Sequence, residues 1–370
     1  MNRYKLENTD LSKFPVLLWI PEASDIFGGH IVQFERTAEY LRNLGWDVTT
    51  DFTPNADLSK YKVVHGLGLS PAQIVKCKQL GAVVVLSTLF CTEYVYPTWR
   101  TKDWLKQKLI RTKVAAECFM HIMNSTSSAV GLKLAQYSLA QKSRYEVADI
   151  LLPNSKMEGD CVVNDLAVTT PQVVVPNSAD RNIFHITQPW EKRKDVVAYC
   201  GRIEPHKNQL NLIRAAKIAK VSLLIIGPAH PDHAEYYDAC IKEAQGHDVK
   251  FLGMQQQQDL VALYNSAKVH ACPSWFETTG LVSLEAALCG CSIVSTNKGY
   301  ASEYFGTDAE FCDPGNVSDI ARAIKAAIQK PASPAFIERV KDEFCWERTA
   351  EKTSEAYLTV LSDAPKVQVS

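Results

Sequence analysis

Two acidic and two basic side chains stand where a parallel α/β sheet would place them beside a ligand. Glu277 follows an apolar run that is typical of a strand, and Glu285 falls on the helical pattern after Gly280. Arg202 and Lys207 come after an earlier strand, with four residues between them. A diphosphate would satisfy both cations, because a guanidinium forks onto two phosphate oxygens and an ammonium acts as a point charge. These residue types therefore indicate a site that stabilises a departing diphosphate.

The helix that carries Glu285 adds a second set of donors. The backbone N–H groups of Thr279, Gly280 and Leu281 open this helix, and a helix N-terminus is a ready anion site. Gly280 lets the backbone approach a ligand with no Cβ in the way. A structural alternative is a helix start decorated with acidic residues for the helix dipole. A purely structural interpretation must also explain Lys207, which is expected at the start of another helix. A cation at a helix start opposes the helix dipole.

Short β-rich runs alternate with helical patterns along almost the whole chain, which is typical of parallel α/β sheets. In the first half we expect a helix from Ile31 to Leu44, a helical insertion over 99–142, and strands at 15–21, 47–52, 62–68, 82–88, 149–155 and 172–178. After a polar linker at 179–195, strand and helix patterns alternate again, which indicates a second doubly wound unit with a helical tail. We therefore predict one domain at 1–178, completed by a C-terminal helix at 346–365 that crosses back, and another at 179–345.

The ordered motifs GRIEPHKNQ, LLIIGP and PSWFETTGLVSLEAALCG resemble the second domain of family 4 glycosyltransferases of the GT-B fold. The element from Glu277 to Glu285, with seven residues between them, is the most specific part. SKMEGD and VVVPNSADRNIF match the family's approach to its linker, so the resemblance covers 145–345 and is looser before that. It implies two Rossmann-like domains facing a central cleft, with the nucleotide-sugar donor held mainly by the second domain and the acceptor by the first.

The resemblance also implies a role for each matched residue. Arg202 and Lys207 would hold the donor diphosphate, Glu285 the ribose, and Glu277 the hydroxyls of the transferred sugar. Backbone donors around sugar and phosphate would come from Thr278, Thr279, Gly280 and Leu281. Retention of the anomeric configuration by front-face attack is implied as well. Relatives often carry Phe or Pro in place of Thr278 and Thr279, which bears on the shape of the sugar pocket.

The first domain matches the family less closely. Gly28 and Gly29 match the family's first loop, where backbone N–H groups approach the donor phosphates or the acceptor, although a glycine pair is more often a turn. Many relatives carry a histidine at the end of the fourth strand, where this chain has Ser87. Either the donor phosphate acts as base unaided or another group takes over, for which His121 is a remote candidate. We interpret His65 as a satisfied core histidine.

The sequence gives little sign of a metal site. No Asp-x-Asp triplet occurs, so the usual carboxylate pair for a metal-bound nucleotide sugar is missing, and we expect no metal and no other cofactor. His230 and His233 have ligand-like spacing, but no further ligand set completes a site, and we interpret them as structural or surface groups. Cys289 and Cys291, among 11 cysteines, are interpreted as buried packing residues.

Composition limits the partners. With 40 basic and 41 acidic residues, the chain has no overall field that would attract nucleic acid. It has no apolar run of membrane-spanning length and no signal-peptide pattern, so we expect a cytoplasmic protein. The segment 99–113 holds six basic residues against one acidic, with Trp and Leu interleaved. It is either a peripheral contact with the inner face of a membrane, which would suit a lipid-linked acceptor, or a helix whose apolar side packs inside the domain.

We predict a metal-independent, retaining glycosyltransferase that moves a hexose-type sugar from a nucleoside diphosphate to a hydroxyl of a glycan or lipid-linked glycan. The pathway we expect is bacterial surface polysaccharide assembly, such as O-antigen, lipopolysaccharide or capsule. Two alternatives stay open: a nucleotide-sugar epimerase or phosphorylase on the same fold, and a non-catalytic nucleotide-sugar-binding partner. Hydrolase, ATPase and dehydrogenase functions lack their motifs in this sequence.

Overall fold

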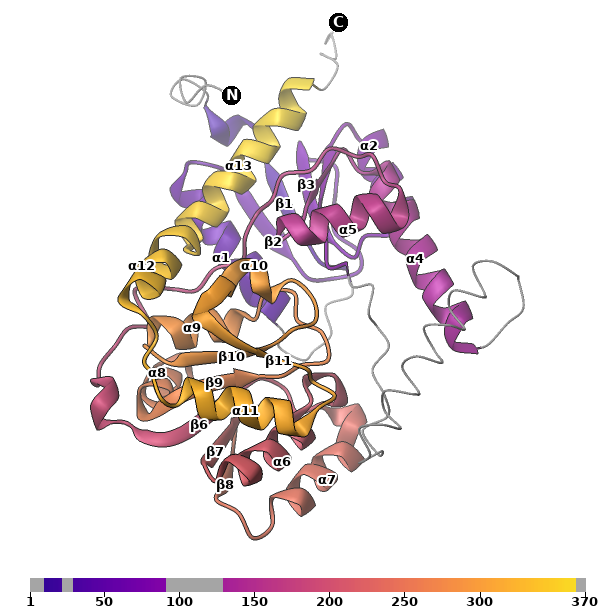
Figure 1. The fold of residues 1–370 in the computed structure, drawn as a ribbon. Helices are drawn as coiled ribbons and strands as arrows, with labels where there is room; N and C mark the ends of the chain where they lie inside the picture. Colours follow the sequence, from indigo (N-terminus) through magenta and orange to yellow (C-terminus); the bar gives the residue numbers. More distant parts are fainter. Residues whose placement is uncertain (1–9, 22–28, 91–128, 364–370) are drawn as a thin grey trace, which may run out of the picture. The chain divides into compact units, whose positions relative to one another are not determined.

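The computed structural model describes residues 10–21, 29–90 and 129–363, which divide into two units. The first unit contains the described residues of Met1–Phe90, Tyr137–Ser178 and Trp346–Ser370, and the second contains Ala179–Cys345 with the described residues of Cys91–Gln136. Each unit carries its own parallel sheet (Figure 1). The segment 99–113 and His121 lie outside the described residues, so the predictions made for them stay predictions.

The first sheet has five parallel strands in the order β2-β1-β3-β4-β5. Its strands are β1 (Val16–Trp19), β2 (Val48–Asp51), β3 (Val63–Leu67), β4 (Val83–Ser87) and β5 (Ile150–Leu152). Every residue of β1 is buried, as expected for a parallel strand that is covered on both faces. Leu17 and Trp19 enter one hydrophobic cluster, whereas Val16 and Leu18 enter another. The sheet therefore has a core on each face, because successive side chains point to opposite sides.

The C-terminal helix completes the first unit. The described helices that accompany the first sheet are α1 (Gly29–Asn43), α2 (Pro71–Gln79), α4 (Ala129–Val147), α5 (Lys156–Leu166) and α13 (Trp346–Asp363). Helix α13, yellow in Figure 1, packs against α1. It contributes Ala350, Ala356, Tyr357 and Val360 to the cluster that contains Val16 and Leu18. The chain thus returns to the first unit after building the second.

The second sheet has six parallel strands in the order β11-β10-β9-β6-β7-β8. They are β6 (Lys194–Cys200), β7 (Ser222–Ile226), β8 (Val249–Gly253), β9 (Ala267–Cys272), β10 (Ser292–Thr296) and β11 (Ala309–Cys312). The helices are α6 (Gln209–Ala219), α7 (Ala234–Ala244), α8 (Gln257–Ser266), α9 (Leu281–Leu288), α10 (Ala301–Phe305), α11 (Val317–Ala327) and α12 (Pro334–Glu343). Helices α6 and α11 pack together over the cluster that holds Val197 and Tyr199, while α9 and α12 pack over the cluster that holds Ala198. Both faces of the sheet are therefore covered.

Two sequence expectations about strands need correction. The strand predicted at 172–178 is wrong: Gln172 forms a single bridge with Leu151, and the following residues form no strand. Val173 and Val175 donate to the carbonyls of Leu151 and Pro153, but Pro153 has no N–H to donate in return, so the bonds beside β5 do not extend into a ladder. The pattern also missed β11, an edge strand of which only Cys312 is fully buried.

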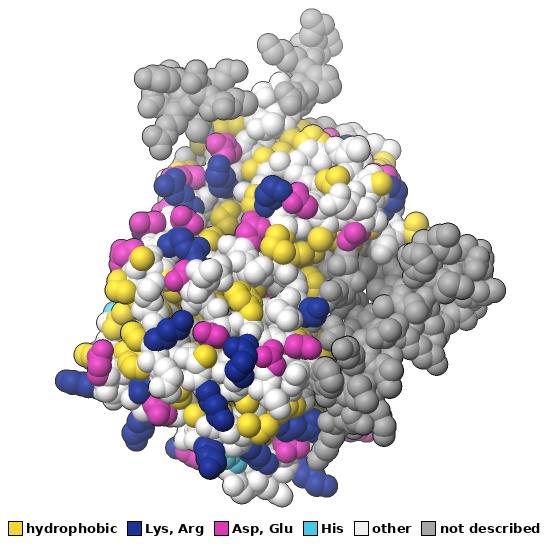
Figure 2. Space-filling model, viewed as in Figure 1, with side chains coloured by type: hydrophobic (Ala, Val, Ile, Leu, Met, Phe, Trp, Pro, Cys, Tyr) yellow, Lys and Arg dark blue, Asp and Glu magenta, His cyan; other side chains and the backbone are white. Residues whose placement is uncertain are grey.

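The described residues include no helix that could span a membrane, and the face drawn in Figure 2 carries charged side chains of both signs. No helix among the described residues is long and apolar enough to cross a bilayer. Figure 2 shows lysine and arginine side chains lying among aspartate and glutamate side chains over the described part of this face. Such mixing does not attract a polyanion over a large area.

Candidate functional site

The candidate site lies beyond the carboxyl ends of β6 and β9, two strands that pair directly in the second sheet. Arg202 comes two residues after β6, and Glu277 comes five residues after β9. Lys207 ends a short 3-10 helix, Pro205–Lys207, and does not start α6 as the sequence predicted. Asn208, with φ 62°, turns the chain between the two helices. Open parallel sheets bind ligands at this edge, so the chemistry and the topology agree.

Lys207 and Glu277 form a direct ion pair. Nζ of Lys207 donates to Oε2 of Glu277 at 2.9 Å, and the two side chains are 26% and 10% exposed. Burial alone would raise the pKa of Glu277, but Lys207 outweighs it and holds that pKa below its ordinary value. Burial likewise acts to lower the pKa of Lys207, and Glu277 raises it above its ordinary value instead. Both groups are therefore charged at neutral pH.

The backbone of Glu277 is fixed by the segment after β10. Its N–H donates to the carbonyl of Lys298 at 3.2 Å, and its carbonyl accepts from the N–H of Tyr300 at 2.9 Å. Gly299 lies between these partners with φ +92°, and a Cβ there would stand 2.2 Å from the carbonyl oxygen of Glu277. Only glycine fits this close approach. The loop that carries Glu277 is thus anchored on both sides of the residue.

Arg202 faces a carboxylate that the sequence reasoning missed. A terminal nitrogen of Arg202 lies 3.5 Å from Oε1 of Glu204, and the side chains are 30% and 12% exposed. The carbonyl of Arg202 accepts from Nε2 of Gln209 at 2.7 Å, which holds the turn after β6. Each cation of the site thus lies beside a carboxylate. An anion that binds here competes with Glu204 and Glu277 for the two cations.

Glu285 lies on the second turn of α9 with different surroundings. The hydroxyl of Tyr264 donates to Oε2 of Glu285 at 3.4 Å. Burial raises the pKa of Glu285 to about 8, and the bond from Tyr264 offsets this only in part. Glu285 is therefore mostly protonated at neutral pH, unlike Glu277. In the described part of the chain no hydrogen bond or ion pair joins Glu285 to Glu277, so the expectation that both face one ligand stays a prediction.

The start of α9 has the geometry expected from the sequence. Gly280 precedes the helix with φ 79°, and Leu281 is its first residue. Thr279 is buried, whereas Thr278 is partly exposed. The left-handed conformation of Gly280 turns the chain from the loop of Glu277 into the helix, so the carboxylate and the helix start are close in the chain and in space.

In the first unit, Gly29 is exposed and opens α1, while Gly28 lies outside the described residues. His65 is buried, with Nδ1 2.7 Å from the hydroxyl of Tyr357 and Nε2 2.8 Å from the hydroxyl of Ser87. Burial lowers the pKa of His65 to about 3, so the ring is neutral. The prediction of a satisfied core histidine is confirmed, and Ser87 at the end of β4 is one of its partners.

Two further residues beside Glu277 were missed by the sequence reasoning. Oγ of Ser274 donates to Oε2 of Glu277 at 3.1 Å, and Sγ of Cys272 lies 3.6 Å from the same oxygen. Both are buried at the end of β9 and just after it. Their only signal in the sequence is nearness to Glu277, because serine and cysteine after a strand are usually packing residues.

The other metal and thiol candidates have structural surroundings. Among the residues that the structure describes, no group of three or more His, Cys, Asp or Glu side chains is arranged to hold a metal ion. Nδ1 of His230 accepts from the N–H of Asp232 at 3.2 Å, which caps a short helix, and the ring of His233 lies 4.9 Å from that of His230. Cys289 and Cys291 are fully buried, and burial raises the pKa of Cys291 to about 12. Their interpretation as packing residues is confirmed.

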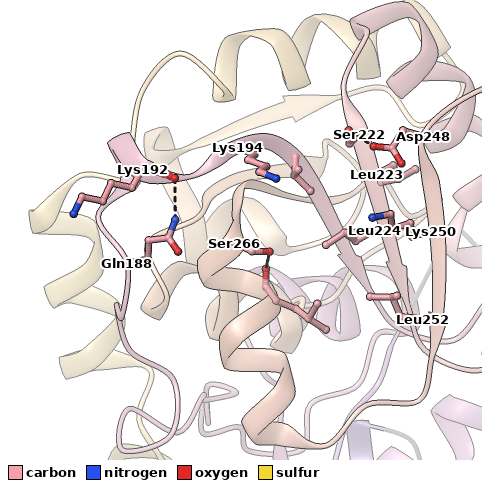
Figure 3. Close-up of a pocket in the computed structure, with 12 residues that line it drawn as sticks. Gln188, Lys192, Lys194, Ser222, Leu223, Leu224, Asp248, Lys250, Leu252 and Ser266 are labelled. Atoms are coloured by element: carbon pink, nitrogen blue, oxygen red, sulfur yellow. Dashed lines mark hydrogen bonds between the residues drawn. The ribbon is translucent and has the colours of Figure 1, made fainter.

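A separate hollow of about 510 Å³ opens at the amino ends of β6 and β7 (Figure 3). Its rim carries Lys192, Lys194 and Lys250, and leucines lie beneath them. In the described part of the chain, no ion pair like that of Lys207 and Glu277 joins these lysines to a carboxylate, although Asp248 also lines the hollow. The hollow lies at the amino ends of the strands, whereas open parallel sheets bind ligands at the carboxyl ends. The cluster around Glu277 is therefore the candidate site, and this hollow is not.

The second unit is similar in sequence to known glycosyltransferases. Residues 180–342 match the family described as Glycosyl transferases group 1. The D-inositol 3-phosphate glycosyltransferase of Rhodococcus opacus (strain B4) is 25% identical over 272 residues, which are 64% of this chain and 61% of that protein. The serotype-specific mannosyltransferase WbdA of Escherichia coli is 26% identical over 246 residues, 62% of this chain and 29% of that protein. The matches thus span less than two thirds of these relatives' own lengths.

The whole described fold has a counterpart among solved structures. Anabaena Alr3699/HepE, solved in complex with UDP, superposes with a TM-score of 0.65 and covers 94% of this chain and 100% of its own. Its sequence identity is 17%, so this likeness shows the fold alone. The chain has the GT-B fold of two Rossmann-like domains, and its residues 180–342 are similar to the group 1 glycosyltransferases.

Proposed function

We propose that this glycosyltransferase moves a hexose-type sugar from a nucleoside diphosphate to a hydroxyl of a glycan or lipid-linked glycan, with retention of configuration. The observation that carries the proposal is the ion pair of Lys207 and Glu277 at the carboxyl edge of the second sheet, where Arg202 follows the end of β6. It brings a phosphate-binding cation within hydrogen-bond distance of a carboxylate that can accept from sugar hydroxyls. The UDP complex of HepE supports a nucleotide ligand for this fold.

In the proposed reaction, Arg202 and Lys207 hold the diphosphate while the bond between its oxygen and the sugar C1 breaks. The electrons of that bond stay on the diphosphate, whose growing charge the two cations stabilise. The acceptor oxygen forms its bond to C1 on the same face, and the acceptor proton passes to the departing phosphate oxygen. Glu277 orients the sugar, and Glu285 hydrogen-bonds the ribose. Backbone N–H groups at the start of α9, from Thr278 to Leu281, complete the donor site.

We propose that the transfer needs no metal ion, because Arg202 and Lys207 supply the positive charge that a divalent cation supplies in enzymes with a carboxylate pair. Activity should therefore survive an excess of EDTA. A strict requirement for added Mg²⁺ or Mn²⁺ would contradict this part of the proposal.

We further propose a place in bacterial surface polysaccharide assembly, in the cytoplasm or at the inner face of its membrane. The similarity to the mannosyltransferase WbdA supports the pathway. The basic segment 99–113 is the proposed contact with an anionic membrane. Reversing the charges of Lys102, Lys106 and Arg111 should then abolish salt-sensitive binding to anionic vesicles, and unchanged binding would rule this contact out.

The experiment that tests the proposal has two steps. Thermal-shift and titration measurements with UDP, GDP, ADP and their sugars identify the donor, because a ligand that binds the folded chain raises its melting temperature. The release of nucleoside diphosphate is then measured with free and lipid-linked glycans as acceptors. Release that depends on an acceptor supports transfer. Tight donor binding without any turnover would favour the non-catalytic partner instead.

A further inference from the structure

Three donors converge on one oxygen of Glu277. Oε2 lies 2.9 Å from Nζ of Lys207, 3.1 Å from Oγ of Ser274 and 3.6 Å from Sγ of Cys272. Among the residues that the structure describes, no hydrogen bond or ion pair reaches Oε1. A carboxylate oxygen accepts about two hydrogen bonds, so Oε2 is filled and Oε1 is the oxygen left for a ligand.

The donors on Oε2 stand on rigid parts of the unit. Cys272 is the last residue of β9 and is 1% exposed, and Ser274 is 0% exposed. The backbone of Glu277 is anchored at the other end of the side chain by Lys298 and Tyr300. A side chain that is held at both ends has little rotamer freedom to lose when a ligand binds, which is what a positioned acceptor requires.

Lys207 and Ser274 differ in what else they bind. Under the proposed function, Lys207 must also serve the diphosphate, and its Nζ is divided between phosphate and Glu277. The hydroxyl of Ser274 contacts only Glu277 and, at 3.4 Å, Cys272 among the described residues. Ser274 therefore keeps its bond to Glu277 whether or not the diphosphate is present.

We infer that Ser274 is a positioning residue of the transfer site: it holds Oε2 of Glu277 so that Oε1 accepts a hydrogen bond from a hydroxyl of the transferred sugar. This inference deepens the proposed function and rests on it. Ser274 itself touches neither the sugar nor the diphosphate. Removal of the Ser274 hydroxyl should leave the affinity for the nucleoside diphosphate unchanged and displace the transferred sugar.

The test compares Ser274→Ala and Ser274→Thr with a matched control, Ser295→Ala. Ser295 is 1% exposed on the neighbouring strand β10, and its hydroxyl has no hydrogen-bond partner among the described residues. The control thus removes a buried serine hydroxyl from the same sheet without touching Glu277. The full chain is used with whichever of UDP, GDP and ADP binds most tightly, and with its sugar.

We expect Ser274→Ala to lower kcat about 10-fold, the effect of removing one hydrogen bond to a charged group. The dissociation constant of the nucleoside diphosphate should stay within about twofold, because the cations are untouched. The acid limb of the pH profile of kcat should move to higher pH. The reason is that the ionised form of Glu277 loses a hydrogen-bond donor, which raises the pKa of Glu277. Ser274→Thr should restore kcat, and Ser295→Ala should behave as the wild type.

The inference is overturned if Ser274→Ala turns over like Ser295→Ala, or if it weakens nucleotide binding as much as turnover. An unmoved acid limb would also overturn it, because a merely structural serine would not affect the ionisation of Glu277. A wild-type chain that turned over no donor would contradict the proposed function itself. That outcome is distinct from a failure confined to the serine variants.

Discussion

Each unit buries a glutamate near the carboxyl end of a strand, and the two have different surroundings. Glu158, in the first turn of α5, is 0% exposed. Its Oε1 accepts from the hydroxyl of Thr88 at 2.7 Å and the N–H of Phe90 at 2.8 Å, and its Oε2 accepts from the N–H of Asn154 at 2.8 Å. Glu277 is 8% exposed, and its side-chain donors among the described residues all reach Oε2, one of them the cation Lys207.

The difference separates a structural carboxylate from one that is set up for a ligand. Glu158 uses both oxygens to tie the loops after β4 and β5, as buried polar groups normally do. Glu277 has one oxygen fixed and the other available, beside a positive charge. Burial and motif alone do not distinguish these two glutamates, but the distribution of donors over their oxygens does.

Among the substitutions that test this difference, Glu277→Gln should have the greatest effect, and that effect is on turnover. Glu277→Gln keeps the shape of the side chain but removes its charge and one acceptor, so kcat should fall about 1,000-fold, as for loss of a strong transition-state contact. Affinity for the nucleoside diphosphate should change only a few-fold, because Arg202 and Lys207 remain. Steady-state kinetics and titration calorimetry measure the two. A kcat within threefold of the wild type would contradict the role of Glu277.

The opposite pattern is expected at the other glutamate. Glu158→Ala leaves two backbone N–H groups and a hydroxyl buried without their acceptor, which should lower the free energy of unfolding by about 3 kcal/mol. Affinity of the second unit for nucleoside diphosphates should not change. Denaturant unfolding and the same titration measure these effects. If Glu277→Gln were the less stable of the two variants, the contrast between the two glutamates would be lost.

The two cations beside the carboxylates provide a test through the affinity for the nucleoside diphosphate. Replacing Arg202 and Lys207 together by alanine should weaken nucleoside diphosphate binding about 100-fold or more, because two charge-assisted contacts are removed. The control is Lys192→Ala with Lys194→Ala, which removes two exposed cations from the hollow at the amino ends of the strands. That pair should bind as the wild type does. Equal losses in both double variants would show that overall charge, and not this site, governs affinity.

The smallest effect concerns pH. The pKa of Glu285 is raised to about 8 from its ordinary 4.5, so between these values the folded chain keeps a proton that the unfolded chain has lost. The free energy of unfolding therefore falls as pH rises through this window. Glu277 acts in the opposite sense: its pKa is lowered from the same 4.5, so its stabilisation is present above that pH and is lost as pH falls through its folded pKa.

Glu285→Gln should remove the loss of stability that ionisation of buried Glu285 causes. The variant should have a melting temperature a few degrees higher than the wild type at pH 8, and a nearly equal one at pH 5. Scanning fluorimetry at the two pH values measures it. The control Glu158→Gln should not raise the melting temperature at either pH. An unchanged pH dependence in Glu285→Gln would show that Glu285 is ionised in the folded chain.

Much of the fold followed from the sequence, because apolar strands and amphipathic helices alternate with little ambiguity. Lys207 and Glu277 were expected in one site since residues after parallel strands gather at one edge of a sheet, and the structure places them 2.9 Å apart. The segment at 172–178 misled the prediction because β propensity says nothing about whether a ladder partner is available, and Pro153 opposite this segment has no N–H to donate.

What the sequence could not give is the choice of rotamer and oxygen. The pairing of Arg202 with Glu204, and the convergence of Ser274 and Cys272 on Oε2, depend on tertiary contacts such as the close approach at Gly299. The role of Glu158 was equally hidden. Its N–H donates to Oγ of Ser155 in the cap of α5, and its carboxylate in addition binds the loops after β4 and β5.

The return of the chain to the first unit at Trp346 bears on the order in which the protein can fold during synthesis. The last residue of the second unit is Cys345, but the core of the first includes Tyr357 and Val360 of α13. A ribosome releases the strands of the first unit long before this helix. The second unit can therefore be complete on the nascent chain while the earlier one still exposes apolar surface, which makes the first-made unit the last to be finished and the natural client of a chaperone.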